Sequence, residues 1–498
     1  MKRLLGLSAV LLPVLMIAVT AAQGQNARWV DPMLGASGGG NVFVGPLAPF
    51  GMIKPGPDMT TPRGDDANAG WAERGTIRGF SQTHVSGTGG GPRYGNILVQ
   101  ATTGAVTPLD TNSPRADEKA RVGYYGVTLS RFGVGVELTA AARSALYRFT
   151  YPKSGQANLL FDVSRCLLAH HIGTAGNESQ VPVASDVYIV SPTEIEGSSS
   201  VKAGWNFAPI PYTVYFYAKT NVPAVTLGTW RDGTLFEGNR SMGGGPETKL
   251  GAWMTFAATD KPVLMKIGIS FVSVAQARKN VEAEIPGFDF AATEAATVAK
   301  WDKALGTVEL KGESDEQRQM FYTALYHTMM QPTDRTGENP MWASNEPYYD
   351  DYYAIWDIFR TSGPLLTLIA PERETGIVRG LVDLYRHEGW LPDARAGNYN
   401  GRMQGGSNAE FMLTDAYVKG LPGIDWQEAY KAEVQDAEAM PPDPEEEGRG
   451  GIKDWLKLGY VSVEGFDKPS STSVEYAAND FEVALLAKGL GETADYEK

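Results

Sequence analysis

The chain has 498 residues, with 44 basic and 58 acidic side chains and a formal net charge of −14 at pH 7. A chain of this length is too long for one hydrophobic core, so two or more domains are expected. An acidic balance without a basic cluster argues against nucleic acid or an anionic membrane as the partner, whereas a neutral glycan is compatible with it. The single cysteine, Cys166, excludes an intramolecular disulfide framework.

The N-terminus has the pattern of a secretory signal peptide. Lys2 and Arg3 precede an apolar run over residues 4–18, and small residues follow it. The alternative is a membrane anchor, but the run is shorter than the ~20 apolar residues that a spanning helix needs, and Pro13 interrupts it. We therefore expect residues 1–24 to be removed, the mature protein to be secreted or periplasmic, and no membrane insertion after cleavage.

Residues 26–285 have the pattern of a β domain. Apolar residues alternate with polar ones, and Gly, Pro, Asn and Ser clusters separate the alternating runs. The clearest alternating positions are Val134, Val136, Leu138, Tyr147, Phe149, Tyr151, Ile267, Ile269 and Phe271. Many short strands at this spacing predict a large β-sandwich.

The rest of the chain is predicted to be helical. The helical region is expected to begin near Asp289, with residues 286–313 as a helical linker, and Ser314 with Gln317 forms a capping box for the next helix. Further helices are expected at about 353–369, 373–387, 409–420, 425–438, 451–458 and 473–489. The composition therefore predicts an α+β multidomain protein.

Two stretches of the β region combine glycines with groups that can contact a ligand. The string WVDPMLGASGGGNVFVGPLAPFGMIKPGPDM contains Phe50 and Gly51, which on pattern alone are a core ring and a turn. In GFSQTHVSGTGGG the glycines let the backbone approach a ligand, and His84, Ser86 and Thr88 supply hydrogen-bonding groups. A phosphate loop is the competing interpretation of this run, but no GK[ST] follows.

The stretch from residue 348 to 408 has the composition of a sugar site. Its aromatic rings suit the apolar face of a pyranose, while carboxylate, guanidinium and amide groups suit its hydroxyls. Asp357 and Arg360 lie three residues apart in WDIFRTSGPLLTLIAPER, so on one helix they are expected to share a face, and a structural ion pair is the competing interpretation. A loop with many amides, GWLPDARAGNYNGRMQGGSNAE, follows, in which any single Asn can also be a solvated turn residue.

Taken together, these strings resemble glycoside hydrolase family 92, the calcium-dependent exo-acting α-mannosidases, over nearly all of residues 29–498. The resemblance implies a β-sandwich followed by an (α/α)6 barrel, which needs six helical hairpins. Only about seven helices are predicted, so we expect residues 314–498 to be the N-terminal part of an incomplete barrel. A fragment of a longer protein is the favoured explanation, and a smaller natural variant is the alternative, because an open barrel would expose an apolar face to water.

The resemblance also implies a substrate site for mannose-containing glycans. It places Asp357 against the hydroxyls of the nonreducing-end mannose. The other residues implied at the site are Phe50, Gly51, His84, Ser86, Gly87, Thr88, Trp356, Arg360, Trp390, Asn398, Gln404, Asn408 and Glu410. Better-known members have His and Asp where this chain has Asn408 and Glu410, which indicates a distinct branch.

The mechanism implied by the resemblance is inversion at the anomeric carbon, with a calcium ion bound to the mannose hydroxyls. The general acid and base are expected beyond Lys498, so no catalytic residue is assigned. The metal-binding motifs HExxH and CxxC are absent from the sequence. The adjacent His170 and His171 would point to opposite faces of a strand, and His327 is expected to be a satisfied, partly buried histidine. The alternative functions are a noncatalytic carbohydrate-binding remnant and, more remotely, a glycoamidase that acts on N-linked glycans.

Overall fold

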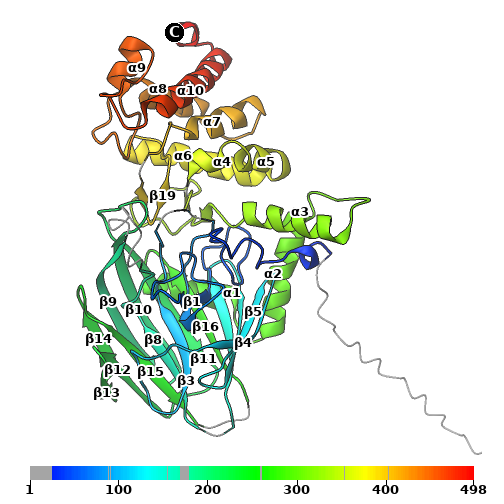
Figure 1. Ribbon diagram of the computed structural model, residues 1–498, viewed down its shortest axis with the longest axis vertical. Coiled ribbons are helices and arrows are strands. Elements are labelled where there is room, and N and C mark those ends of the chain that lie inside the picture. Colours follow the sequence, from blue (N-terminus) through cyan, green and yellow to red (C-terminus); the bar gives the residue numbers. More distant parts are fainter. Residues whose placement is uncertain are drawn as a thin grey trace, which may run out of the picture.

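The computed structural model describes residues 25–498 except 88, 90, 154, 169–178, 258–260, 353 and 402. A β region forms one end of the molecule and a stack of helices forms the other (Figure 1). The predicted signal peptide and the pair His170 and His171 lie outside the described residues. Of the helices described, none is both long enough and apolar enough to cross a lipid bilayer.

The described residues of the β region form sixteen strands in two antiparallel sheets that pack face to face. One sheet has the order β1-β2-β3-β8-β15-β12-β13 and the other β14-β9-β10-β11-β16-β7-β6-β5-β4. The strands are β1 Gly56–Thr60, β2 Thr76–Ser81, β3 Leu98–Thr103, β4 Arg115–Arg121, β5 Tyr124–Leu129, β6 Val134–Ala140, β7 Ser144–Thr150, β8 Ala157–Asp162, β9 Gln180–Ser191, β10 Glu194–Ala203, β11 Tyr212–Thr220, β12 Thr226–Arg231, β13 Thr234–Glu237, β14 Ser241–Gly244, β15 Leu250–Phe256 and β16 Val263–Ser270.

The alternation read from the sequence forms the core of this sandwich. All nine predicted apolar positions on β6, β7 and β16 and at their ends are buried in one cluster between the sheets. The period of two puts every second side chain of a strand on the same face, so a short apolar run is enough to specify which face is buried. The predicted β-sandwich is confirmed.

The helical region follows the sandwich and has short strand pairs between its helices. It begins with α1 Val274–Glu284, α2 Phe290–Leu305 and α3 Asp315–Thr328. The later elements are β17 Thr333–Asp334, β18 Tyr349–Asp350, α4 Ile355–Ile358, α5 Ser362–Ile369, α6 Pro371–Glu388, β19 Arg395–Ala396, β20 Tyr399–Asn400, α7 Ala409–Val418, α8 Trp426–Glu438, α9 Ile452–Leu458, α10 Pro469–Leu490 and α11 Thr493–Glu497. The predicted α+β fold, a sandwich followed by helices, is confirmed.

Two of the helix predictions need correction. Helix α1 lies within the range predicted to be β and packs on β16 and β11, so the helices begin at Val274 rather than near Asp289. Its burial of Ala277 and Val281 against the sheet outweighs a weak amphipathic pattern. The predicted helix 353–369 is two helices, α4 and α5, because the chain turns between them. The capping box of Ser314 and Gln317 is confirmed at the start of α3.

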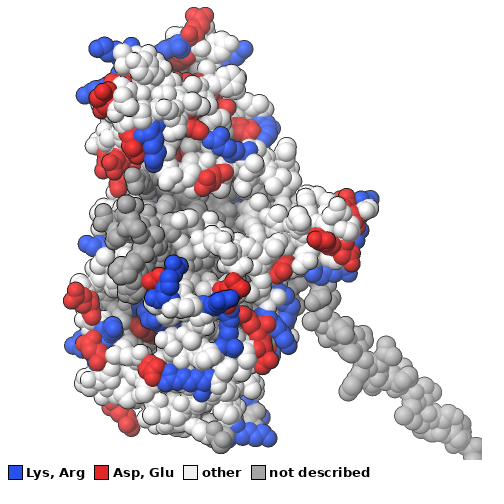
Figure 2. Space-filling view, viewed as in Figure 1, with Lys and Arg blue, Asp and Glu red and all other residues white. Residues whose placement is uncertain are grey.

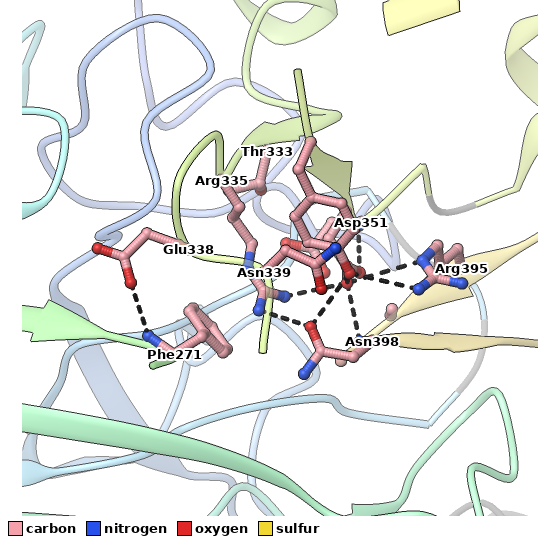
Figure 3. A network of polar contacts seen from close by, with 12 residues as sticks. Phe271, Thr333, Arg335, Glu338, Asn339, Asp351, Arg395 and Asn398 are labelled. Atoms are coloured by element: carbon pink, nitrogen blue, oxygen red, sulfur yellow. Dashed lines mark hydrogen bonds and ion pairs between the residues drawn. The ribbon is translucent and has the colours of Figure 1, made fainter. Parts of the chain in front are cut away.

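A fully buried polar network lies between the sandwich and the helices (Figure 3). Asp350 Oδ2 accepts hydrogen bonds from Arg335 Nη1 at 3.0 Å and from the backbone N–H of Asn398 at 2.8 Å. Arg335 Nη2 also donates to Asn398 Oδ1 at 2.6 Å, and the Nε of Arg395 lies 3.9 Å from Asp350 Oδ2. The carboxylate of Asp350 therefore faces the guanidinium groups of Arg335 and Arg395, and none of these three side chains is exposed to solvent.

The network continues into the β domain through Tyr94. The Tyr94 hydroxyl donates to Asp351 Oδ1 at 2.5 Å and accepts from the backbone N–H of Gly397 at 3.0 Å. Glu338 holds the other side, because its Oε2 accepts from the Ser270 hydroxyl and from the backbone N–H of Phe271. These bonds join residues far apart in the sequence, so they fix how the two regions sit against each other.

Asp350→Ala should destabilise the protein by about 3–5 kcal/mol, because it leaves the buried guanidinium of Arg335 without its carboxylate, while Arg395 keeps its pair with Glu388. Urea unfolding followed by circular dichroism would measure the change. Asp467→Ala is the control, since Asp467 is exposed and pairs only with the neighbouring Lys468. Equal midpoints for the two variants would show that the network does not hold the domains together.

Candidate active-site cleft

A cleft of about 160 Å³ lies where a loop of the β domain meets the helices. Its walls come from the glycine-rich loop after β2, the end of α3 and helices α4 to α7. The residues that line it are Ser86, Gly87, His327, Thr328, Gln331, Pro332, Tyr352, Asp357, Ile358, Ser362, Gly363, Leu366, Glu374, Ile377 and Met412. Apolar side chains with a few polar groups are the usual lining of a ligand site.

Asp357 is the exposed carboxylate of this cleft. It lies on the short helix α4, and no other residue that the structure describes donates a hydrogen bond to its side chain or pairs with it. The competing interpretation, an ion pair with Arg360, is wrong, because Arg360 lies in the turn after α4 and its Nη2 donates to Glu475 Oε1 at 2.5 Å. The carboxylate of Asp357 is therefore available to a ligand, whereas Arg360 joins α4 to α10.

Several buried polar atoms that line the cleft have no hydrogen-bond partner among the described residues. They are Gln331 Nε2, His327 Nε2 and both carboxyl oxygens of Glu374. Buried polar atoms in native proteins are nearly always paired with protein, water or ligand, so a group of unpaired ones at one cleft marks a place for a bound molecule. His327 is partly buried as predicted, but its Nε2 is not satisfied within the described chain.

Burial also determines the charge of these groups. It raises the pKa of the Glu374 carboxyl to about 8, and the nearby carboxylate of Asp415 adds to the shift. Burial lowers the pKa of His327, and Asp31 opposes this only in part. Both side chains are therefore neutral at pH 7, and a protonated Glu374 can donate as well as accept a hydrogen bond.

The β-domain side of the cleft is formed by Ser86 and Gly87. The Ser86 hydroxyl accepts from the backbone N–H of Phe43 at 3.2 Å and contacts the Met330 sulfur. Gly87 is exposed with φ of 76°, and no atom would approach a Cβ placed there. The backbone at Gly87 is thus open on this side of the cleft, and ligand binding there stays a prediction. Thr88 lies outside the described residues.

Phe50 and Gly51 lie beneath the site and form part of its support. Phe50 is 3% exposed in the core of the helical region, and the Arg373 guanidinium covers its ring at 4.8 Å from the centroid. Lys54 Nζ donates to the carbonyl of Gly51 at 2.9 Å and to Thr333 Oγ1 at 2.8 Å. This turn therefore ties the β domain to the helices, and the Phe50 ring has no free face for a sugar.

His84 is also part of the support. Its Nε2 lies 2.8 Å from Asp58 Oδ1 and its Nδ1 lies 2.7 Å from the carbonyl oxygen of Lys54. A Cβ on Gly70 would come within 2.5 Å of the ring, so glycine is needed there for close packing. His84 orders the segment that contains Lys54 and does not reach the cleft.

The other residues predicted at the site are spread through the helical region. Trp356 packs beside the β19 strand, and Asn398 belongs to the network of Asp350. Trp390 is 7% exposed and packs closely on Gly448, while Gln404 is exposed at a separate small hollow near Phe466. None of these side chains lines the cleft as the described residues form it.

Asn408 and Glu410 are buried in a polar cluster at the start of α7. Asn408 Nδ2 donates to Asp393 Oδ1 at 3.1 Å, and Arg449 Nη2 donates to both oxygens of Glu410 at 3.1 and 3.2 Å. Burial raises the pKa of Asp393 to about 7. These residues bond to one another, so their first role in this structure is to hold the loop from Asp393 to Glu410 in place.

Sequence reasoning missed Gln331 and Glu374 as cleft residues. Gln331 carried no signal, because its position depends on the chain leaving α3 beside the β-domain loop. Glu374 did carry one: it faces the apolar side of α6 together with Ile377 and Val378. A single acidic residue on an otherwise apolar helix face is a sign of a buried functional or structural carboxyl.

The buried Glu374 should make stability fall as pH rises. Its pKa is about 8 in the folded protein and near 4.5 in the unfolded chain, so only the folded state binds the proton between these values. Glu374→Gln removes this pH dependence. Between pH 5 and pH 8, the free energy of unfolding of the variant should therefore rise by roughly 3 kcal/mol relative to that of the wild type. Urea midpoints at pH 5, 6, 7 and 8 would show it. Parallel curves would contradict the prediction, and Glu372→Gln, on the exposed face of α6, is the control.

Models of known protein families divide the chain close to the boundary between its β region and its helical region. The model of the glycosyl hydrolase family 92 N-terminal domain matches residues 29–270, and that of the family 92 catalytic domain matches residues 276–498. An uncharacterised secreted glycosidase of Arthroderma benhamiae is 32% identical over 525 aligned residues, which cover 97% of this chain and 62% of that protein. The chain thus spans less than two thirds of this curated relative.

Solved structures with the same fold include two from Bacteroides thetaiotaomicron. A family GH92 α-mannosidase in complex with mannoimidazole has a TM-score of 0.83 and 29% identity, covering 95% of this chain and 62% of its own. A family GH92 inverting mannosidase has a TM-score of 0.82 and 23% identity, covering 96% and 64%, and shows the fold alone. From these matches over both of its regions, the chain belongs to glycosyl hydrolase family 92.

Proposed function

We propose that the protein is an exported α-mannosidase that removes α-linked mannose from glycans with inversion. Family membership supports a glycoside hydrolase, and the relative of 29% identity is described as an α-mannosidase. The observation that carries the proposal is the cleft, in which the free carboxylate of Asp357 lies among buried polar atoms without partners. Export is supported by the predicted signal peptide and by the secreted relative.

The cleft residues would act by binding and orienting the sugar. Asp357 would accept hydrogen bonds from two neighbouring hydroxyls, and Gln331 Nε2 would donate to a hydroxyl oxygen. The neutral side chains of Glu374 and His327 would form further hydrogen bonds to the sugar without adding a charge to the cleft. A cleft of about 160 Å³ is small enough to select a single terminal ring, which suits exo-action.

Inverting hydrolysis needs a protonated carboxyl and a carboxylate ~6.5–9.5 Å apart. Asp357 is proposed to bind the sugar and not to be the general acid or the general base. In the described part of the chain, no three His, Cys, Asp or Glu side chains gather in a way that could hold a metal ion. These side chains therefore do not fit a calcium site of that kind, and the proposed calcium requirement rests on the family resemblance.

The purified protein should release free mannose from yeast mannan, and proton NMR during the first minutes should show the β-anomer as the initial product. Release of an intact glycan would indicate a glycoamidase, and the α-anomer as first product would indicate retention. The same assay with EDTA, then with added calcium chloride, tests the metal requirement, for which loss and recovery of release are expected. Mannan binding without any release would favour the noncatalytic carbohydrate-binding alternative.

Asp357→Asn should lower kcat/KM for mannose release about 10–100-fold, because a charge-assisted hydrogen bond to a sugar hydroxyl is worth about 1.5–3 kcal/mol. Its melting temperature should match the wild type, since the carboxylate contacts no described partner. Glu372→Gln changes an exposed carboxyl of the nearby helix α6 and is the matched control. Equal kcat/KM in both variants would remove Asp357 from the site.

A further inference from the structure

A second and larger cavity, of about 440 Å³, lies on the outer face of the seven-stranded sheet. Leu98 and Gln100 of β3 and Leu160 and Asp162 of β8 point into it. The residues that alternate with them point into the sandwich core instead: Val99, Ala101, Leu159 and Phe161. The cavity shares no lining residue with the cleft at Asp357, so the two are separate.

The floor of this cavity is apolar and rigid. Leu160 and Trp230 pack with Trp253 in a small cluster of their own outside the sandwich core. Trp230 can pack closely against β15 because residue 251 is glycine, where a Cβ would come within 2.8 Å of the indole and 1.8 Å of a backbone oxygen. The strand pattern and this glycine therefore build a preformed hollow, which is typical of small-ligand sites.

The wall of the cavity contains more hydrogen-bond donors than the protein itself uses. Arg165 Nη2 lies 2.6 Å from both oxygens of Asp66, and Arg78 Nη2 lies 3.9 Å from the same carboxylate. The Nε atoms of both arginines are buried without a partner among the described residues. Two guanidinium groups thus share one carboxylate.

An acceptor lies beside these donors. Oδ1 of Asp162 accepts from the backbone N–H and the hydroxyl of Ser164, and Oδ2 accepts no hydrogen bond from the described residues. The cationic side chains of Arg78, Arg165 and Lys249 are matched by the carboxylates of Asp162 and Glu247 on the wall and of Asp66 behind it, so these formal charges sum to zero. An anionic ligand would therefore meet the carboxylate of Asp162, whereas a sugar hydroxyl can donate to this carboxylate and accept from an arginine.

We propose that this cavity is a second saccharide site, which binds a neutral sugar unit of the glycan away from the cleft. It deepens the proposed function, because a glycan held on the β domain would keep its other termini near the cleft. The volume falls within the range of about 300–1,000 Å³ for small-molecule sites. The sugar's C–H face would lie on the Leu98 and Leu160 side, with hydroxyls toward Asp162 and Arg78.

Calorimetric titration with an S-linked α-mannobioside, which glycosidases hydrolyse poorly, tests this by counting sites on the full protein. The wild type should bind two molecules, and Asp162→Asn should weaken one site at least tenfold. Val181→Trp, at an exposed rim position, should do the same by obstructing the entrance. Glu309→Gln, an exposed carboxyl in the linker, is the control and should keep both sites.

The outcomes separate this inference from the proposed function. Binding that depends on Asp162 in a protein that releases no mannose would support the second site and reject the α-mannosidase proposal. One site in the wild type that Asp162→Asn leaves unchanged, or two sites unchanged in both cavity variants with normal melting temperatures, would overturn the inference. Displacement of the mannobioside from the Asp162-dependent site by inorganic phosphate would also overturn it, since the site would then be one for anions.

Discussion

The carboxylate of Asp350 lies between the guanidinium groups of Arg335 and Arg395, and all three side chains are fully buried. Removing charges from water is costly, and only close pairing and complete hydrogen bonding offset that cost. The close pairing of Asp350 exists only when the helices dock on the sandwich, because Tyr94 and Phe271 of the β region close the network, and it leaves the Nε atoms of Arg335 and Arg395 without a hydrogen-bond partner among the described residues. The relative position of the two regions is thus fixed by electrostatics as well as by apolar packing.

The cleft depends on that docking, since one wall comes from each region. Gly87 belongs to a loop of the sandwich, and Asp357 belongs to helix α4, which comes shortly after Asp350 in the sequence. Lys54 acts at the same boundary, where it bonds the Gly51 turn to Thr333. Residues such as Phe50 and His84 therefore matter to the site by holding its walls in place, without contact with the cleft. On the face shown in Figure 2, acidic and basic side chains of the described residues are interspersed over both regions.

The fold was predictable from the sequence because its signals are local. Alternation at Val134, Val136 and Leu138 specifies a strand face, and Ser314 with Gln317 specifies a helix start. The site was predictable only in part. Asp357, Ser86 and Gly87 do line one cleft, whereas Asn408 and Glu410 bond inside the protein, because Arg449 and Asp393 arrive from other segments to pair with them. A list of polar residues in a loop cannot show which of them the fold will satisfy internally.

The neutrality of Glu374 and His327 also bears on which sugars the cleft admits. With these two groups uncharged, the carboxylate of Asp357 is the formal charge among the residues that line the cleft. A phosphorylated or carboxylated sugar would bring a second negative charge into a small, partly buried space whose described lining residues include no Lys or Arg, where repulsion is screened far less than in water. If the cleft binds a sugar as proposed, this arrangement would discriminate against glycans capped by an acidic group, and the selectivity would come from protonation rather than from shape.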